Sequence, residues 1–205
     1  MVEDFLRQSP LAHLGLATHA RAELAADDGV ALAERPFRTV ITLRGSGGEG
    51  AFAAAVEQAS GLKLPQEVGA VSGEAEGRQL LCLGPDEWWL CDGDSDAESL
   101  LAALEDPLAG QFASAVDTSD NWFALEISGA HAADLLAKAC PLDLHPRSFP
   151  AGRCARSLLS KAPMTLQKLN ESPRFRIHVR RSFADYAWRW LSDAGREYGV
   201  SVLSA

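Results

Sequence analysis

The sequence predicts an α+β fold built from two similar halves, each a two-layer sandwich of helices packed on a sheet. Three observations lead to this prediction. Strand-like stretches of alternating apolar residues are interleaved with helix-like stretches, and the 47% hydrophobic content is typical of a globular protein with a core. The same order of strand, glycine, helix, Leu-x-Leu segment, hairpin and helix occurs twice, with Gly45 and Gly129 in matching places. We therefore expect a first half over residues 1–110 and a second over 111–205, packed closely together.

Each element of the first half has its own pattern. β-Branched side chains alternate in VITLRG, and the helical spacing of Phe52 and Val56 predicts a helix that stops at Gly61. Proline at the second place of GPDE predicts a tight turn within a hairpin. Ser95 and Glu98 have the spacing of a capping box. The expected elements are a first strand at 40–45, a helix at 49–60, strands at 79–83 and 88–92, and a helix from Ser95 to Leu104.

The second half follows the same plan. Alternation in WFALEIS places Trp122 and Glu126 on one face of a strand. The helix after it should stop at Pro141, and a last helix should start at Ser182 with Asp185 as its capping partner. The expected elements are a strand at 122–128, a helix at 130–140, strands at 153–159, 164–169 and 175–179, and a helix from Ser182.

Composition limits the class of protein. A formal net charge of −9 argues against a nucleic-acid binder, which needs clustered Lys and Arg to displace counterions. Because the chain has neither a long apolar run nor a basic leader followed by an apolar stretch, we expect a cytoplasmic protein with no membrane association. Four cysteines without a CxxC pair predict reduced, buried thiols.

The net charge hides an asymmetry between the halves. Residues 1–119 carry 20 acidic and 7 basic side chains, whereas residues 120–205 carry 8 acidic and 12 basic ones. One stretch of the second half contains nine cations and a single acid, Glu171. A solvated face and a docking surface for an acidic partner or an anionic ligand are both open interpretations. The cations are Arg147, Arg153, Arg156, Lys161, Lys168, Arg174, Arg176, Arg180 and Arg181.

Part of this basic stretch is a candidate partner interface. Arg174, Arg176 and Arg180 alternate along one predicted strand, so they should share a face and lie together. If they form a positive patch on an acidic protein, acid on a partner should match it and steer association.

Tryptophan pairs supply the other interface candidates. Trp88 and Trp89 must point to opposite faces of their strand, and Trp188 and Trp190 lie about 200° apart around a helix. The two members of a pair therefore cannot both face one single-sided core. We expect cover for the exposed member from a partner chain, where Trp is enriched, with ordinary core burial as the alternative for each residue singly.

The sequence assigns no catalytic, cofactor-binding or metal-binding residue. The glycine-rich GSGGEG at 45–50 lacks both the Lys-Ser/Thr ending of a phosphate-binding loop and the GxGxxG spacing of a dinucleotide fingerprint. The five histidines are dispersed, and no two stand four residues apart as metal ligands on a helix often do.

Several short strings together resemble the gamma subunit of heterotetrameric sarcosine oxidase. The likeness spans about residues 30–191, and the order and spacing of the strings make it specific. The strings are LRG (43–45), GLKLP (61–65), LGPDEWWL (83–90), PLDLHP with FPAGRCARS (141–157) and RSFADYAWRWL (181–191).

This resemblance implies a role in a complex. Such a complex oxidatively demethylates sarcosine to glycine with O2, giving hydrogen peroxide and formaldehyde or, with tetrahydrofolate, methylenetetrahydrofolate. It implies alpha, beta and delta subunits as partners. It also implies that FAD, FMN, NAD, zinc and tetrahydrofolate are on those partners and that this chain holds none of them.

The second half also resembles, more distantly, the folate-dependent aminomethyltransferase superfamily, through residues 116–144. Those enzymes carry an acidic, glycine-containing hairpin where this chain has LLSKAPMTLQKL (158–169), which contains no acid. They also continue into a C-terminal barrel for which we expect no room here. The resemblance implies halves like the N-terminal part of those enzymes and a noncatalytic structural subunit, which we expect not to be catalytic alone. The alternative is a free-standing folate-binding aminomethyltransferase-like protein, with the basic stretch at 147–181 holding the folate carboxylates.

Overall fold

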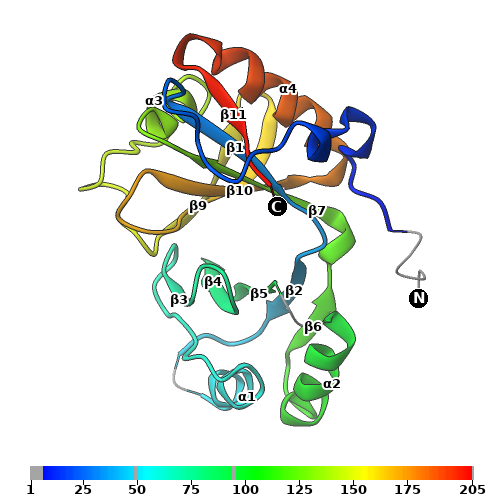
Figure 1. Cartoon of the computed structure of the whole chain (residues 1–205). Helices are drawn as coiled ribbons and strands as arrows, with labels where there is room; N and C mark the ends of the chain where they lie inside the picture. Colours follow the sequence, from blue (N-terminus) through cyan, green and yellow to red (C-terminus); the bar gives the residue numbers. More distant parts are fainter. Residues whose placement is uncertain (1–6, 49, 94–95, 205) are drawn as a thin grey trace.

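The computed structural model describes residues 7–48, 50–93 and 96–204. Its elements form four layers, in which two sheets face one another and each sheet carries helices on its outer side (Figure 1). One hydrophobic cluster fills each helix–sheet unit, and a third, smaller cluster lies between the sheets. This confirms the predicted α+β class and its two-layer units.

A five-stranded antiparallel sheet has the order β3-β4-β5-β2-β6. Its outer face is covered by α1 and α2, whose Phe52, Val56, Leu100 and Leu104 are buried against the strands. The elements are β2 (Thr39–Arg44), α1 (Ala51–Ser60), β3 (Val71–Gly73), β4 (Gln79–Gly84), β5 (Glu87–Asp92), α2 (Ala97–Leu108) and β6 (Ser114–Asp117).

A six-stranded sheet has the order β11-β1-β7-β10-β9-β8, with β1 and β11 parallel and its other pairs antiparallel. Helices α3 and α4 cover its outer face (Figure 1). The elements are β1 (Val30–Arg35), β7 (Trp122–Ser128), α3 (Ala132–Ala137), β8 (Cys154–Leu159), β9 (Ala162–Lys168), β10 (Arg174–Arg180), α4 (Ala184–Ala194) and β11 (Val200–Val202). Short 3-10 turns lie at Ala12–Leu14, Leu16–Thr18, Ser119–Asn121, Arg181–Phe183 and Arg196–Tyr198.

The sheets do not follow the predicted division between residues 110 and 111. The first strand is β1 rather than the segment at 40–45, and it pairs with β7 in the sheet of the second half. In return, β6 pairs with β2 in the sheet of the first half. The sequence signal for β1 is weak because its first four residues are all buried, so the apolar and polar residues do not alternate.

Three predicted helices are corrected at their ends. Asp96 caps α2 by accepting a hydrogen bond from the Ser99 amide at 2.7 Å, and α2 runs on to Leu108; Ser95 lies outside the described residues. Helix α3 covers only Ala132–Ala137. Ser182 lies in a 3-10 turn before α4, and the Asp185 carboxylate accepts from Arg189 Nε at 2.7 Å instead of capping the helix. The start of α4 therefore has no side-chain cap, and Asp185 forms an ion pair one helical turn away.

The matching glycines of the two halves have a steric reason. A Cβ on Gly129 would lie 2.4 Å from the Gly29 carbonyl oxygen, and a Cβ on Gly45 would lie 2.4 Å from the Phe52 ring. In both halves the chain leaves a central strand where another group already occupies the side-chain position, so only glycine fits.

Candidate functional site

The most highly charged part of the interior is the space between the two sheets. Glu126 projects from β7 and is only 4% exposed. Its carboxylate accepts hydrogen bonds from Arg176 Nη2 at 2.5 Å, Arg174 Nη2 at 2.6 Å and Arg35 Nη2 at 3.1 Å. Strand register explains the cluster, because Arg176 is directly opposite Glu126 in the β7–β10 pair.

The cluster fixes the ionisation of Glu126. Burial alone would raise the pKa of this carboxyl, but the charge of Arg176 and the hydrogen bonds of the three arginines outweigh burial and lower the pKa from 4.5 to about 2. The same arginines reach the other sheet. Arg176 Nη1 donates to the Ala75 carbonyl at 2.8 Å, and Glu76 lies 2.5 Å from Arg174 Nη2. A charged cluster therefore holds the β3–β4 loop onto the six-stranded sheet. We call this cluster the clamp, and it consists of Glu126, Arg35, Arg174 and Arg176.

Other polar contacts cross between the halves around this clamp. Gln167 Nε2 donates to Gln79 Oε1 at 3.1 Å, and Arg153 Nη1 lies 2.6 Å from a Glu67 carboxylate oxygen. Arg156 forms a bidentate ion pair with Glu87. The two sheets are thus joined by complementary polar groups as well as by apolar packing.

His178 is buried in the same space between the two sheets. Its ring meets the Trp89 ring edge-on, with the ring centroids 5.7 Å apart. Burial, followed by the charges of Arg176 and Arg38, lowers the pKa of this imidazole from 6.5 to about 3, so it is neutral at ordinary pH. Within the described part of the chain, neither ring nitrogen has a hydrogen-bond partner. His178 is therefore uncharged at neutral pH and buried away from solvent.

The structure divides the predicted arginine patch. Arg174 and Arg176 lie together, as their alternation predicts, but they face inward to Glu126, and Arg176 is 1% exposed. The expectation that Arg176 belongs to a surface patch is wrong. Arg180 is exposed and stacks over the Trp122 ring, 4.2 Å from its centroid. Counting charges within the basic stretch did not reveal these ion pairs, because the acidic partners come from other strands and from the first half.

Most of the tryptophan side chains at the candidate interface are buried within the chain itself. Trp88 and Trp89 do point to opposite faces of β5, yet both are 1% exposed, because helices cover one face and the second sheet covers the other. Trp88 Nε1 also donates to the Pro65 carbonyl at 2.8 Å. Cover by a partner is therefore wrong for this pair. Trp188 of α4 is buried in the core of the six-stranded sheet, and Trp190 packs half-buried against the same core, so the expectation that these two cannot share one core is wrong.

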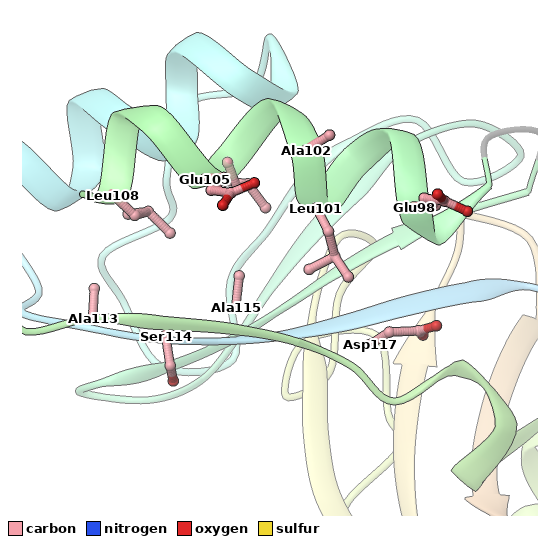
Figure 2. Close-up of a pocket in the computed structure, with 10 residues that line it drawn as sticks. Glu98, Leu101, Ala102, Glu105, Leu108, Ala113, Ser114, Ala115 and Asp117 are labelled. Atoms are coloured by element: carbon pink, nitrogen blue, oxygen red, sulfur yellow. The ribbon is translucent and has the colours of Figure 1, made fainter. Parts of the chain in front are cut away.

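An open groove of about 610 Å³ lies on the far side of the five-stranded sheet, between α2 and the edge strand β6. Figure 2 shows Leu101 pointing from the helix toward the strand, with Ala113 and Ala115 pointing back toward the helix. The acids Glu98, Glu105 and Asp117 also line the groove. Sequence reasoning missed this feature.

The remaining expectations concern thiols, metals and membranes. All four cysteines are free and buried, as predicted, and burial raises the pKa of Cys91 and of Cys154 to about 12. Across the described ranges, no group of three or more His, Cys, Asp or Glu side chains could hold a metal ion. In the same part of the chain, no helix is long and apolar enough to cross a bilayer.

Comparison with known proteins identifies the family. The model of the "Sarcosine oxidase, gamma subunit family" matches residues 44–197. The chain belongs to this family. It is 39% identical to the sarcosine oxidase subunit gamma of Corynebacterium sp. (strain U-96), over 97% of this chain and 95% of the relative. It is 38% identical to the subunit gamma of an Arthrobacter species, with the same coverage.

Solved structures agree with this assignment to the gamma subunit family. A chain of the heterotetrameric sarcosine oxidase from Corynebacterium sp. U-96, solved with pyrrole 2-carboxylate, matches with a TM-score of 0.84 and 37% identity, over 94% of this chain and 96% of that one. Aminomethyltransferase T of the glycine cleavage system from Bartonella henselae matches with a TM-score of 0.61 and 19% identity, over 95% of this chain and 51% of that one. The second likeness concerns the fold.

A short hairpin joins β8 and β9 in this gamma subunit family member. Strands β8 and β9 pair up to Leu159 and Ala162, and the turn between them holds Ser160 and Lys161. Ser160 has a left-handed φ of 53°. The turn offers a cation and a hydroxyl, and no carboxylate.

Proposed function

We propose that this chain is a noncatalytic structural subunit of a heterotetrameric sarcosine oxidase. The observation that carries the proposal is the full-length match to gamma subunits, at 39% identity over 97% of this chain. The chemistry of the interior supports the noncatalytic role. Three arginines hold Glu126 as an anion, so this group forms internal ion pairs. His178 is neutral and buried, so it packs in the core.

We assign alpha, beta and delta subunits as the partners. The complex would oxidise sarcosine to glycine with O2, and FAD, FMN, NAD, zinc and tetrahydrofolate would be bound by those partners. The lack of a dinucleotide fingerprint in this sequence supports that division of labour. We propose a cytoplasmic location for the complex. Arg180 and Trp190, which keep exposed or half-buried surface, remain proposed partner contacts.

The alternative of a free-standing folate-binding protein has less support. It relied on the basic stretch at 147–181 to hold the carboxylates of folate. Arg153 instead pairs with Glu67, Arg156 with Glu87, and both Arg174 and Arg176 with Glu126. At these arginines a folate carboxylate would have to displace an internal acid.

Expression alone and with candidate partner subunits tests the proposal. We expect the chain alone to show no flavin absorbance and no oxidase activity on sarcosine. Together with the partners, it should elute as one larger complex that has flavin absorbance and oxidises sarcosine. Flavin absorbance or sarcosine oxidation by the chain alone would contradict the noncatalytic role. Tetrahydrofolate binding by the chain alone, without assembly, would support the alternative.

A further inference from the structure

Strand β6 leaves the five-stranded sheet with an unfinished edge. In the described part of the chain it pairs with β2 on one side and with no strand on the other. Free edges of sheets offer main-chain donors and acceptors to an added strand, and proteins usually shield them. Ala115 of β6 and Ala113 just before it face α2, and their small side chains leave the groove open (Figure 2). Asp117, the last residue of β6, also lines the groove, so the charge at this edge is acidic.

The groove beside this edge has an apolar floor and an acidic rim. Leu101 and Leu108 of α2 lie across from Ala113 and Ala115. Glu98 and Glu105 form the helix side of the rim, and none of the described residues lining the groove is a cation. The C-terminal turn of α2 has no basic residue, so its carbonyl dipoles add to the negative potential.

Apolar surface continues along the same edge. A second cavity, of about 630 Å³, shares Ala113 and Ser114 with the groove and includes Phe112. The Phe112 side chain is fully exposed, and Val116 is 52% exposed. Exposed apolar side chains around an open strand edge are typical of a surface that another chain covers.

We infer that this edge receives an extended, Lys- or Arg-containing segment of another subunit, added to the sheet as a sixth strand. The inference rests on the proposed function and names the chemistry of one contact. The strand edge selects an extended main chain, the alanines and leucines select apolar side chains, and the acidic rim selects cations. A second copy of this chain fits poorly, because Glu98, Glu105 and Asp117 would meet the same acids.

Crosslinking within the assembled complex tests the contact. A photo-crosslinking amino acid at Ala102, an exposed position lining the groove, should couple to a Lys- or Arg-containing segment of another subunit. The matched control is the same substitution at Ala54, which is exposed on α1. Exchange of the amide hydrogens at 114–117 should slow at least about tenfold on assembly, as expected for newly paired strand amides.

Charge reversal supplies an independent readout. Glu98→Lys with Glu105→Lys should weaken assembly about tenfold or more, whereas Glu57→Lys on α1 should change it less than about twofold. Phe112→Ser should also weaken assembly without affecting the fold, because that side chain is fully exposed.

The outcomes separate this inference from the proposed function. If the wild-type chain forms no complex with the partner subunits, the proposed function fails and this inference fails with it. If the complex forms but Ala102 crosslinks to nothing, to a second copy of this chain or to a segment without cations, only the inference is overturned. Unchanged exchange at 114–117 in a complete complex would overturn it equally.

Discussion

Glu126 and Glu105 show two uses of the same side chain in one molecule. Glu126 lies between the sheets, is 4% exposed and accepts hydrogen bonds from three arginines. Glu105 lies on α2, is exposed and forms no ion pair within the described part of the chain. The first carboxylate therefore holds the folded chain together. The second leaves its charge available to another molecule.

The comparison also explains the charge asymmetry of the halves. The acidic first half supplies Glu67, Glu76 and Glu87, and the basic second half supplies their arginine partners. Much of the basic stretch that looked like a docking surface is thus neutralised inside the chain. Among the described residues, Glu98, Glu105 and Asp117 beside β6 form no ion pair, so their negative charge stays unmatched at this edge of the first sheet.

The largest expected effect comes from neutralising Glu126. Glu126→Gln leaves three arginines beside a neutral side chain in a buried layer, which should cost about 3–5 kcal/mol of unfolding free energy. The matched change Glu98→Gln at the open groove should stay within about 0.5 kcal/mol. Urea unfolding of both variants measures the difference. Equal losses would mean that the two regions do not differ in the way that their burial implies.

Low pH should also remove the stabilising contribution of the buried Glu126 carboxylate. The pKa of Glu126 is about 2 in the folded chain and 4.5 ordinarily, so its contribution is fully present above pH 4.5 and is lost as the pH falls toward 2. The loss should be on the order of 3 kcal/mol. Unfolding free energies measured from pH 6 to pH 2 should therefore fall less steeply for Glu126→Gln than for the wild-type chain. Identical slopes would contradict the lowered pKa.

Sequence patterns predicted most of the fold because they record local geometry. The hairpin at β4 and β5, the glycine after α1 and the alternation of β7 are all set by residues close in sequence. β1 and β6 were not predicted because their sheet membership depends on which distant strand they meet. A six-residue strand buried on both faces resembles any short apolar run.

The candidate sites were less predictable for a related reason. Burial of both members of the Trp88 and Trp89 pair requires a second sheet over the first, and no pattern within β5 reveals that sheet. Likewise, Glu126 carried a usable signal, since a charge in the middle of an apolar strand requires a partner. Its partners Arg174 and Arg176 lie far along the chain, and only the β7–β10 register brings them together.

A half-exposed pair should fall between the two extremes. Arg156 bridges to Glu87 from β8, and its side chain is 49% exposed. Glu87 keeps a second partner in Arg44, so Arg156→Met should cost about 1 kcal/mol or less. The loss should shrink at high salt, unlike that of Glu126→Gln. A salt-independent loss in urea unfolding would place this pair with the buried clamp.

Replacing His178 should have only a modest effect at neutral pH, although this side chain is as buried as those of Arg176 and Glu126. Both ring nitrogens lack hydrogen-bond partners among the described residues, so His178→Phe removes no bond and keeps an aromatic ring against Trp89. The unfolding free energy at pH 7 should change by less than about 1.5 kcal/mol.

The variant should differ from the wild-type chain in acid. The folded pKa of about 3 lies below the ordinary 6.5, so the unfolded chain takes up the proton first and wild-type stability falls as the pH drops from 6.5 toward 3. His178→Phe should lose that part of the fall and keep the part below pH 4.5 that belongs to Glu126. A large loss at pH 7 would show instead that the imidazole makes a bond that the layer depends on.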